Sequence, residues 1–308
     1  AGAGAPTGSA IAGAGQINVG RFSFTAPATT GVTVSGMTFT KVGVVSDSNI
    51  SNLYLADVNT GAVVAQFQSL SASVATFSGL ALNVAAGQTA WYELRADISS
   101  SATSGNTIAF DLTGVTTVGS TSVAGLPVKG NVLTVTSVSN PAIATVSMTE
   151  TTNSSANSTV DAGTNSVLVS QWTVAVTNSP VYLRSLQYSF VGSANVGDVR
   201  NLRLLVNGNQ VATLPMAATE TVFSMNANPL KLNTGNSTLQ IFADVAGSPN
   251  RTFRFSLLQP YKANFMDSQY NAGITATVTN TSYSFSINTG SITVAVASDS
   301  PTTAVPAG

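Results

Sequence analysis

The sequence contains no cysteine and no histidine among its 308 residues. Without cysteine the chain can form neither a disulfide framework nor a thiolate metal site. Without either residue, the Ser-His-Asp and Cys-His systems of many hydrolases are excluded. We therefore expect a protein that is not an enzyme and needs no cofactor, and we assign no catalytic, cofactor-binding or metal-binding residue.

Charge is also scarce, because only 7% of the residues are Asp, Glu, Lys or Arg and the formal net charge is −1. Ordinary soluble proteins carry roughly 25% charged residues. A nucleic-acid partner would require a basic stripe, and the chain has none. A near-neutral surface with few charges is poorly protected against association, which suits a protein that polymerises with copies of itself.

Long apolar runs are missing as well. No stretch of 18 apolar residues occurs, so we expect no membrane span in this segment. The chain opens with "AGAGAPTG", which has no Met and no basic region followed by an apolar run. We expect either a signal that has been removed or a piece of a longer protein.

Strand and turn residues are what the sequence has in abundance. Hydrophobic residues make up 44% of the chain, and the remainder is largely Ser, Thr, Asn and Gly. In "NLRLLV" (201–206) apolar residues alternate around Arg203, as in a half-buried strand. The "NGN" that follows predicts a hairpin turn, because Asn-Gly tolerates the positive φ angles of primed turns. The "VNTG" at 58–61 predicts a second hairpin.

The chain also repeats itself. "LNVAAGQTAWYELRADISSSATSGNTIAFDLTG" (82–114) and "LNTGNSTLQIFADVAGSPNRTFRFSLLQ" (232–259) carry the same order of turns and apolar runs, and Asp97 falls on Asp244. The match extends without a break in order through three further pairs of segments: 15–26 with 165–176, 32–40 with 181–189, and 51–67 with 200–214. This regularity favours a duplicated domain.

Strands separated by Gly, Asn and Ser turns, with more than about 100 residues in each copy, predict an all-β fold of two tandem Ig-like β-sandwich domains that arose from an internal duplication. We place the first domain, with an N-terminal connector, at 1–139 and the second at 140–308. The second domain begins with a polar linker at about 140–163 and ends in a connector at 298–308. Alternation predicts that these side chains are buried: Phe22, Phe24, Met37, Phe39, Leu53, Leu55, Trp172, Val174, Leu186, Tyr188, Leu202 and Leu204.

A shorter repeat marks the ends of the domains. "NVLTVTSVSNPAIATV" (131–146) aligns with "GSITVAVASDSPTTAV" (290–305), which puts Leu133 on Ile292 and Pro141 on Pro301. Each domain is therefore expected to end in a strand and to continue through an extended Pro-rich connector. The last ten residues read as the start of a third copy.

Several phrases resemble a known kind of repeat. "VTVSGMTFTKVG", "SDSNISNLYLAD", "ATFSGLALNVAAGQTAWYELRADISSSATSGNTIAFDLTGV" and "ITVAVASDSPTTAVPAG" are similar to repeat modules of long bacterial and archaeal cell-surface proteins. Those proteins include surface-layer and appendage subunits built from tandem Ig-like domains. The resemblance covers nearly all of the first copy and the C-terminal segment, and it implies a structural role outside the cell.

Three candidate sites have a simpler structural interpretation. Glu93 and Asp97 would lie about 13 Å apart on one extended strand, too far for a glycosidase pair; we expect Asp97 to cap the turn that follows it. "SDSN" (46–49) with Asp57 could hold Ca²⁺, although a solvated turn is favoured. The four lysines leave open a Lys–Asn or Lys–Asp isopeptide crosslink.

Six Asn-x-Ser/Thr triplets provide candidate acceptors for N-linked glycans: Asn49, Asn153, Asn157, Asn236, Asn250 and Asn280. Glycans are therefore possible partners. Such triplets also accumulate by chance in a chain this rich in Asn, Ser and Thr.

The function that these observations favour is a structural subunit of an extracellular assembly, a pilus-like filament or a surface layer, that polymerises head to tail through its terminal segments. The alternative is a cell-surface adhesin or carbohydrate-binding module, which would need exposed aromatic platforms. Trp91 and Trp172 are the only tryptophans, and both lie in strand patterns that predict burial. We expect an extracellular or cell-surface location. The candidate contacts between subunits are Ile292, Val294, Val296, Pro301, Val305, Pro6 and Ile11.

Overall fold

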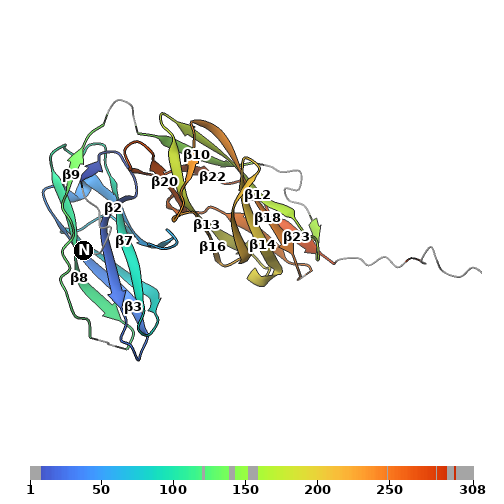
Figure 1. Ribbon diagram of the computed structural model, residues 1–308, viewed down its shortest axis with the longest axis horizontal. Helices are drawn as coiled ribbons and strands as arrows, with labels where there is room; N and C mark the ends of the chain where they lie inside the picture. The colour runs from blue at the N-terminus through green and yellow to red at the C-terminus, as the bar shows by residue number, and fades with distance from the viewer. Residues whose placement is uncertain are drawn as a thin grey trace, which may run out of the picture.

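A computed structural model describes the chain over residues 8–119, 122–138, 143–151, 159–247, 249–281, 283–289 and 295. Its secondary structure there is β-strand with three single-turn 3-10 helices, η1 (Asp47–Asn49), η2 (Val196–Asp198) and η3 (Pro260–Lys262), and no α-helix. The prediction of an all-β fold is therefore confirmed. Figure 1 shows two bodies of sheet arranged along the long axis of the molecule.

The first body, which we call the first sandwich, contains the strands up to residue 136. One sheet has five strands in the order β1-β9-β8-β3-β6, and the other has four in the order β2-β7-β4-β5. Apolar side chains of both sheets form one core between them. The strands are β1 (Ser9–Ile11), β2 (Ile17–Thr25), β3 (Val32–Val42), β4 (Ile50–Asp57), β5 (Val63–Gln68), β6 (Val74–Val84), β7 (Thr89–Ile98), β8 (Thr107–Thr117) and β9 (Leu133–Thr136).

The second sandwich contains the strands from residue 145 onward. Its six-stranded sheet has the order β15-β14-β18-β12-β10-β22, and its larger sheet has the order β11-β23-β19-β13-β20-β21, with β16 and β17 also paired to β13. The strands are β10 (Thr145–Glu150), β11 (Thr159–Asp161), β12 (Val167–Thr177), β13 (Val181–Gly192), β14 (Val199–Val206), β15 (Asn209–Met216), β16 (Glu220–Ser224), β17 (Leu230–Leu232), β18 (Gly235–Val245), β19 (Thr252–Ser256), β20 (Ala263–Asp267), β21 (Gly273–Ile274), β22 (Thr277–Thr279) and β23 (Phe285–Asn288).

The two sandwiches share a strand order. β2-β7-β4-β5 in the first corresponds to β12-β18-β14-β15 in the second. The parallel pair β1–β9 corresponds to the parallel pair β11–β23. Irregular register also recurs at matching places, between Asn18 and Gly20 in β2 and between Leu168 and Ser170 in β12. Duplication as the origin of this likeness stays a hypothesis.

The structure differs from the prediction in two segments: the linker between the two copies and the last strand of the second copy. Thr145–Glu150, inside the expected polar linker, is strand β10, because Val146 and Met148 point into the second core. The position of β9 is taken in the second sandwich by β23, which lies upstream of Ile292. A period-two apolar pattern fits either segment, so sequence alone could not choose between them.

The predicted core is confirmed with one exception. Eleven of the twelve side chains are buried, among them Phe39 and Trp172 at 0% exposure, whereas Phe24 is half-buried. Phe24 lies on β2, which is at the edge of its sheet and pairs with β7 alone among the described strands. The predicted hairpin at Asn207-Gly208 joins β14 to β15, and both residues have positive φ.

Candidate functional site: the junction between the two sandwiches

The sandwiches meet through the outer faces of two sheets. β7 is buried on both sides, because Tyr92 and Leu94 point into the first core while Glu93 and Arg95 point toward the second sandwich. β13 shows the same double burial, with Gln187 directed at the first sandwich. A strand with both faces covered has no solvent-facing side, so its polar residues must find partners within the protein.

Arg95 and Glu93 form a buried ion pair at this junction. The guanidinium Nε donates to Glu93 Oε1 over 2.6 Å, and the two side chains are 2% and 4% exposed. The guanidinium also donates to the Gln16 side chain and to the Gly61 carbonyl, each over 3.3 Å. From the second sandwich, the amide oxygen of Asn264 accepts from both Nη atoms over 3.1 Å. Arg95 therefore holds parts of both sandwiches through a single planar group.

Side chain to backbone hydrogen bonds extend the contact. The side-chain amide of Gln187 accepts from Val63 N over 3.2 Å and donates to Val63 O over 3.4 Å. It therefore makes the two backbone hydrogen bonds that a neighbouring strand would make with Val63. Asn226 donates to the Val58 carbonyl over 2.6 Å, and Ser185 donates to the Gly61 carbonyl. These bonds satisfy the β4–β5 turn and fix its position against β13.

Aromatic and apolar groups complete the junction. The rings of Tyr54 and Tyr261 lie 5.1 Å apart between centroids. Burial and the neighbouring charge of Asp97 raise the pKa of Tyr54, whose hydroxyl donates to that carboxylate over 2.6 Å. Ala272 reaches from the second sandwich into the first core. The junction thus combines core-like packing with a hydrogen-bonded polar network. Within the described residues, two buried atoms of that network, Gln16 Nε2 and Asn226 Oδ1, have no hydrogen-bond partner.

A further cation, the half-buried Arg184, lies beside this network. Burial lowers the pKa of Arg184, and the charges of Arg95 and Arg21 act in the same direction, while Glu93 opposes them. Arg21 lies directly opposite Glu93 in the β2–β7 ladder, so charged groups concentrate here in a chain that has few of them. The Arg95–Glu93 pair favours one fixed arrangement of the sandwiches, because any other would take Asn264 away from the guanidinium.

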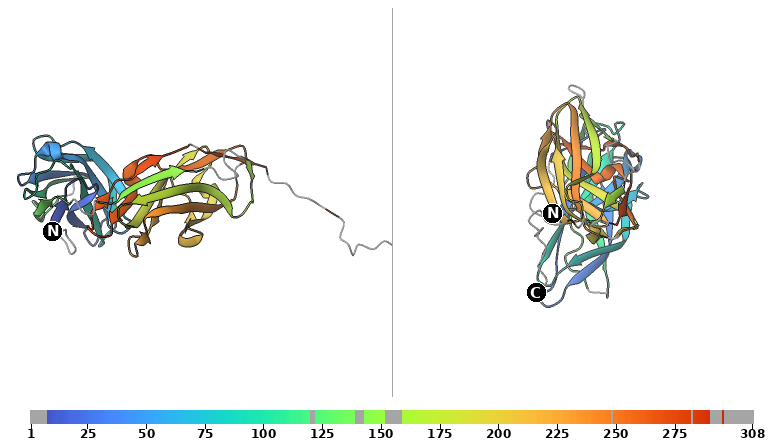
Figure 2. Two further views of the ribbon diagram at one scale, coloured as in Figure 1. Left: turned by 90° about the horizontal axis from the view of Figure 1, so that it is seen from above. Right: turned by 90° about the vertical axis from the view of Figure 1, so that its right-hand side faces the viewer.

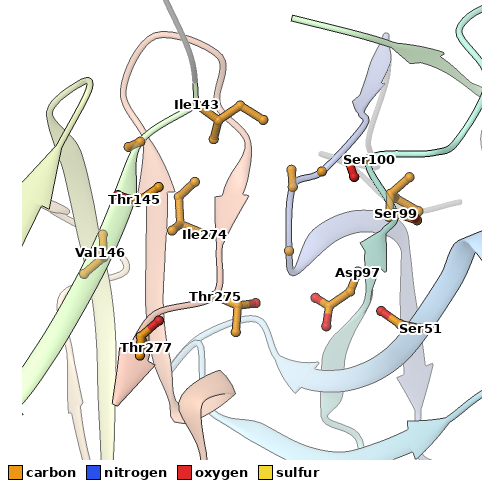
Figure 3. Close-up of a pocket in the computed structure, with 15 residues that line it drawn as sticks. Ser51, Asp97, Ser99, Ser100, Ile143, Thr145, Val146, Ile274, Thr275 and Thr277 are labelled. Atoms are coloured by element: carbon orange, nitrogen blue, oxygen red, sulfur yellow. The ribbon is translucent and has the colours of Figure 1, made fainter. Parts of the chain in front are cut away.

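A cleft of about 500 Å³ opens beside the junction. Figure 3 shows Ser51, Asp97 and Ser99 on the wall formed by the first sandwich, facing Thr275 and Thr277 of the second. The wall residues offer hydroxyls and one carboxylate, and neither a nucleophile–base pair nor an aromatic side chain is among the described residues that line it. Isoleucine and valine side chains lie among these polar groups, so the cleft is a mixed polar and apolar recess.

The prediction that Asp97 caps the following turn is wrong. Its Oδ1 accepts from Gln16 N over 2.7 Å and its Oδ2 accepts from Asn52 over 2.9 Å, so it joins β2 to β4. The aligned Asp244 makes the same two kinds of bond, with Ser166 N and Asn201. These bonds lower the pKa of Asp244.

Other candidate positions have structural partners. Asp47 pairs with Lys41 over 3.1 Å and accepts from Ser73, whereas Asp57 accepts from Thr60 within its own turn. The two carboxylates share no partner, and no group of three potential metal ligands occurs in the described part of the chain. Lys129 and Asp111 form a second lysine–aspartate ion pair.

The candidate contact residue Ile11 lies in β1, where it is 7% exposed and packs against the first core. The remaining contact candidates lie outside the described residues: Pro6, Ile292, Val294, Val296, Pro301 and Val305. Of the glycan acceptors, Asn236 and Asn250 are exposed, while Asn49 accepts from Ser101 and Asn280 binds both backbone groups of Leu257. Asn153 and Asn157 lie outside the described residues.

The tryptophans differ from one another. Trp172 is fully buried, as predicted, but Trp91 is half-buried and lies under the Arg21 guanidinium, 6.0 Å from the ring centroid. Trp91 is on the outer face of its sheet, opposite in direction to the core residue Tyr92. This junction was not predicted from the sequence. The signal that could have indicated it is Glu93 and Arg95, two opposite charges on the same face of one strand.

Fold and site together define an all-β protein of sandwich-like architecture with a buried polar junction. In the part of the chain that the structure describes, no helix is long and apolar enough to cross a membrane. No protein-family model matches the sequence, and no curated protein matches it.

Among solved structures, the chain is similar to the major capsid protein P2 from Bacteriophage PM2, at 10% sequence identity and a TM-score of 0.19. That match covers 75% of this chain and 94% of the capsid protein. A likeness at this level establishes neither a shared fold nor a shared role.

Proposed function

We propose that this protein is a structural subunit of an extracellular filament or surface layer, and that copies join head to tail through their terminal segments. The same proposal has three further parts. The chain belongs to the Ig-like surface repeat proteins, its two sandwiches arose by duplication, and its domains span 1–139 and 140–308. The partners would be copies of the chain itself, with glycans attached at exposed asparagines.

The observation that carries the proposal is the fixed junction. Arg95, Gln187 and Asn264 bind across it, so the two sandwiches present one rigid unit to a neighbour. Figure 2 shows this unit extended along one axis, and Figure 1 labels β23 at the end far from the first sandwich. A rigid elongated unit with different ends makes heterologous contacts, and these produce open polymers unless the rotation closes a ring.

The test is negative-stain electron microscopy of the full chain beside a variant that lacks residues 290–308. The deletion removes none of the described strands, and residue 295 is the one described residue within it, so thermal unfolding should be unchanged. We expect ordered fibres or layers from the full chain and dispersed particles from the shortened one. Fibres of normal order from the shortened chain would contradict joining through the C-terminal segment.

A second candidate function is that of an adhesin or carbohydrate-binding module. The cleft of about 500 Å³ favours it, because serine and threonine hydroxyls from both sandwiches line the recess. Binding on a glycan array that is lost in Ser51→Ala and Thr275→Ala variants, together with dispersed monomers in the microscope, would support this alternative over the first.

A further inference from the structure

One edge of the second sandwich shows how this fold accepts an added strand. β10 pairs antiparallel with β12, placing Val146 opposite Val176 and Met148 opposite Val174, and on its other side it pairs in parallel with β22. Both β10 side chains are buried, at 4% and 0% exposure, and close the core along that edge. β10 follows the connector after the first sandwich. It is an extended segment, and it is not one of the strands that the two sandwiches have in common.

The corresponding edge in the first sandwich is β2. Its ladder to β7 matches the ladder of β12 to β18, so Phe24 corresponds to Val174 and Ala26 to Val176. In the described residues β2 has no strand on its other side. Phe24 is half-buried, whereas Val174 is completely covered.

A groove of about 300 Å³ runs beside this open edge. Its walls include apolar side chains from both sheets of the first sandwich, contributed by Phe24, Val32, Val34, Val84 and Val115. In the second sandwich the aligned edge is where Val146 and Met148 of β10 are buried. The groove and the edge together have the form of a strand acceptor: backbone groups on one side and an apolar channel beside it.

A second apolar segment follows β23 in the chain. β23 takes the position of β9 in the second sandwich, and "SITVAVAS" (291–298), which aligns with β9 in sequence, comes after it. Ile292, Val294 and Val296 alternate with small or polar residues, as Val146 and Met148 do in β10. The segment lies outside the described residues apart from residue 295.

From this placement we propose that residues 291–298 of one copy add as an antiparallel strand to the open edge of β2 in a second copy. Ile292 lies opposite Ala26, Val294 opposite Phe24 and Val296 opposite Phe22, which is the register of β10 on β12. The inference rests on the proposed function and deepens it by naming the donor and the acceptor. Main-chain hydrogen bonds would supply affinity, and the three apolar side chains would set the register.

Single cysteines test the register, because the natural chain contains no cysteine. A Thr25→Cys protein is mixed under mild oxidation with a Thr293→Cys protein that carries a mass tag. Thr25 is exposed, and Thr293 takes the position of Ser147, which faces the residue aligned with Thr25. We expect a mixed disulfide at least about tenfold above that from a Ser78→Cys control on β6, because docking raises the local concentration of the two thiols.

A matched pair of substitutions separates docking from chance collision. Val294→Asp in the tagged protein directs a carboxylate into the groove and should abolish the mixed disulfide, whereas Ala295→Asp points to solvent and should preserve it. Equal yields for Thr25→Cys and Ser78→Cys, or a Val294→Asp protein that crosslinks normally, would overturn the inference.

The outcomes also separate this inference from the proposed function. Fibres that require residues 290–308 but show no preferred Thr25–Thr293 disulfide would leave the proposed function standing and remove β2 as the acceptor. A preferred disulfide without fibres or layers under any condition would keep the strand contact and contradict the polymer.

Discussion

Arg95 lies on a strand whose two faces are both buried, and its guanidinium is 2% exposed. It binds Glu93 within its own strand, Gln16 from a neighbouring segment and Asn264 from the other sandwich. At the residue scale, the junction therefore depends on the Arg95 guanidinium, most of whose N–H groups donate hydrogen bonds. A buried ion pair adds little net stability by itself, but removing one member leaves the other charge without compensation.

Arg95→Ala should lower the free energy of unfolding by about 3–5 kcal/mol, because the buried Glu93 would lose the guanidinium that it binds directly. Arg200→Ala, at an exposed arginine, should change it by less than about 0.5 kcal/mol. Urea denaturation measures both. A double Glu93→Met, Arg95→Met variant should recover most of the loss; if it is as unstable as Arg95→Ala, uncompensated charge is not the cause.

Among the described residues, Asp267 is a carboxylate fully enclosed by hydrogen-bond donors. It is 0% exposed and accepts from Ala144 N, Ser179 Oγ, Gln269 N and Tyr270 N. Burial alone would raise its pKa, but these hydrogen bonds together outweigh burial and hold the pKa below its ordinary value.

Because the pKa of Asp267 is lower in the folded than in the unfolded state, its charged carboxylate stabilises the fold. This stabilisation is fully present above the ordinary Asp pKa of about 3.9, and it is lost as the pH falls through the folded pKa. Asp267→Asn should therefore cost about 2–4 kcal/mol at pH 7, because its amide NH₂ would face donors. The difference from wild type should shrink as pH is lowered from 5 toward about 2, measured by urea denaturation at each pH. A difference that is constant over this range would contradict the assignment.

At the scale of elements, β2 and β3 show how the position of a strand in its sheet decides how deeply an aromatic residue is buried and how much stability it contributes. Phe39 on β3 is 0% exposed and contacts Phe22 and Phe77, with ring centroids 5.3 and 5.9 Å away. β3 lies inside its sheet, between β8 and β6. Phe24 lies on an edge strand beside the groove and is only half-buried.

Phe39→Ala should cost about 3–5 kcal/mol, because it leaves a cavity that its neighbours cannot fill. Phe24→Ala should cost less, about 1–2 kcal/mol, because less of its surface leaves water on folding. Thermal or urea unfolding of the separate variants compares them directly. A Phe24→Ala loss equal to that of Phe39→Ala would mean that the edge of β2 is covered in solution.

At the scale of the whole molecule, the two sandwiches are held at a fixed distance by close backbone contact. A Cβ added to Gly273 on β21 would lie 2.1 Å from Gly15 O and 2.7 Å from Gln16 O. Both of those oxygens belong to the main chain of the first sandwich, so no side chain can rotate to make room. Glycine is required there by the approach of the other sandwich and not by an unusual φ angle.

Gly273→Ala should therefore force the junction apart. We expect a larger radius of gyration by small-angle X-ray scattering and a loss of about 1–3 kcal/mol of stability, typical of overpacking. Gly197→Ala, where the added Cβ meets nothing within 4 Å, is the matched control. If both variants scatter as wild type does, the sandwiches are not held in this arrangement in solution.

The sequence by itself determined the strand character of the chain, most of both cores and the Asn207-Gly208 hairpin. These depend on contacts with a period of two residues and on local φ preferences, which neighbouring residues specify. Eleven of twelve predicted core residues are buried for this reason.

Tertiary structure alone decided which segment fills which edge and how the sandwiches meet. β23 and the segment at 291–298 have similar alternation, and only pairing with β11 and β19 selects the former. Gln187 binds Val63 from 124 residues away, and Asn264 meets Arg95 across two separate cores. No local pattern encodes such contacts, because they arise when two independently folded faces are brought together and their buried polar groups must be satisfied.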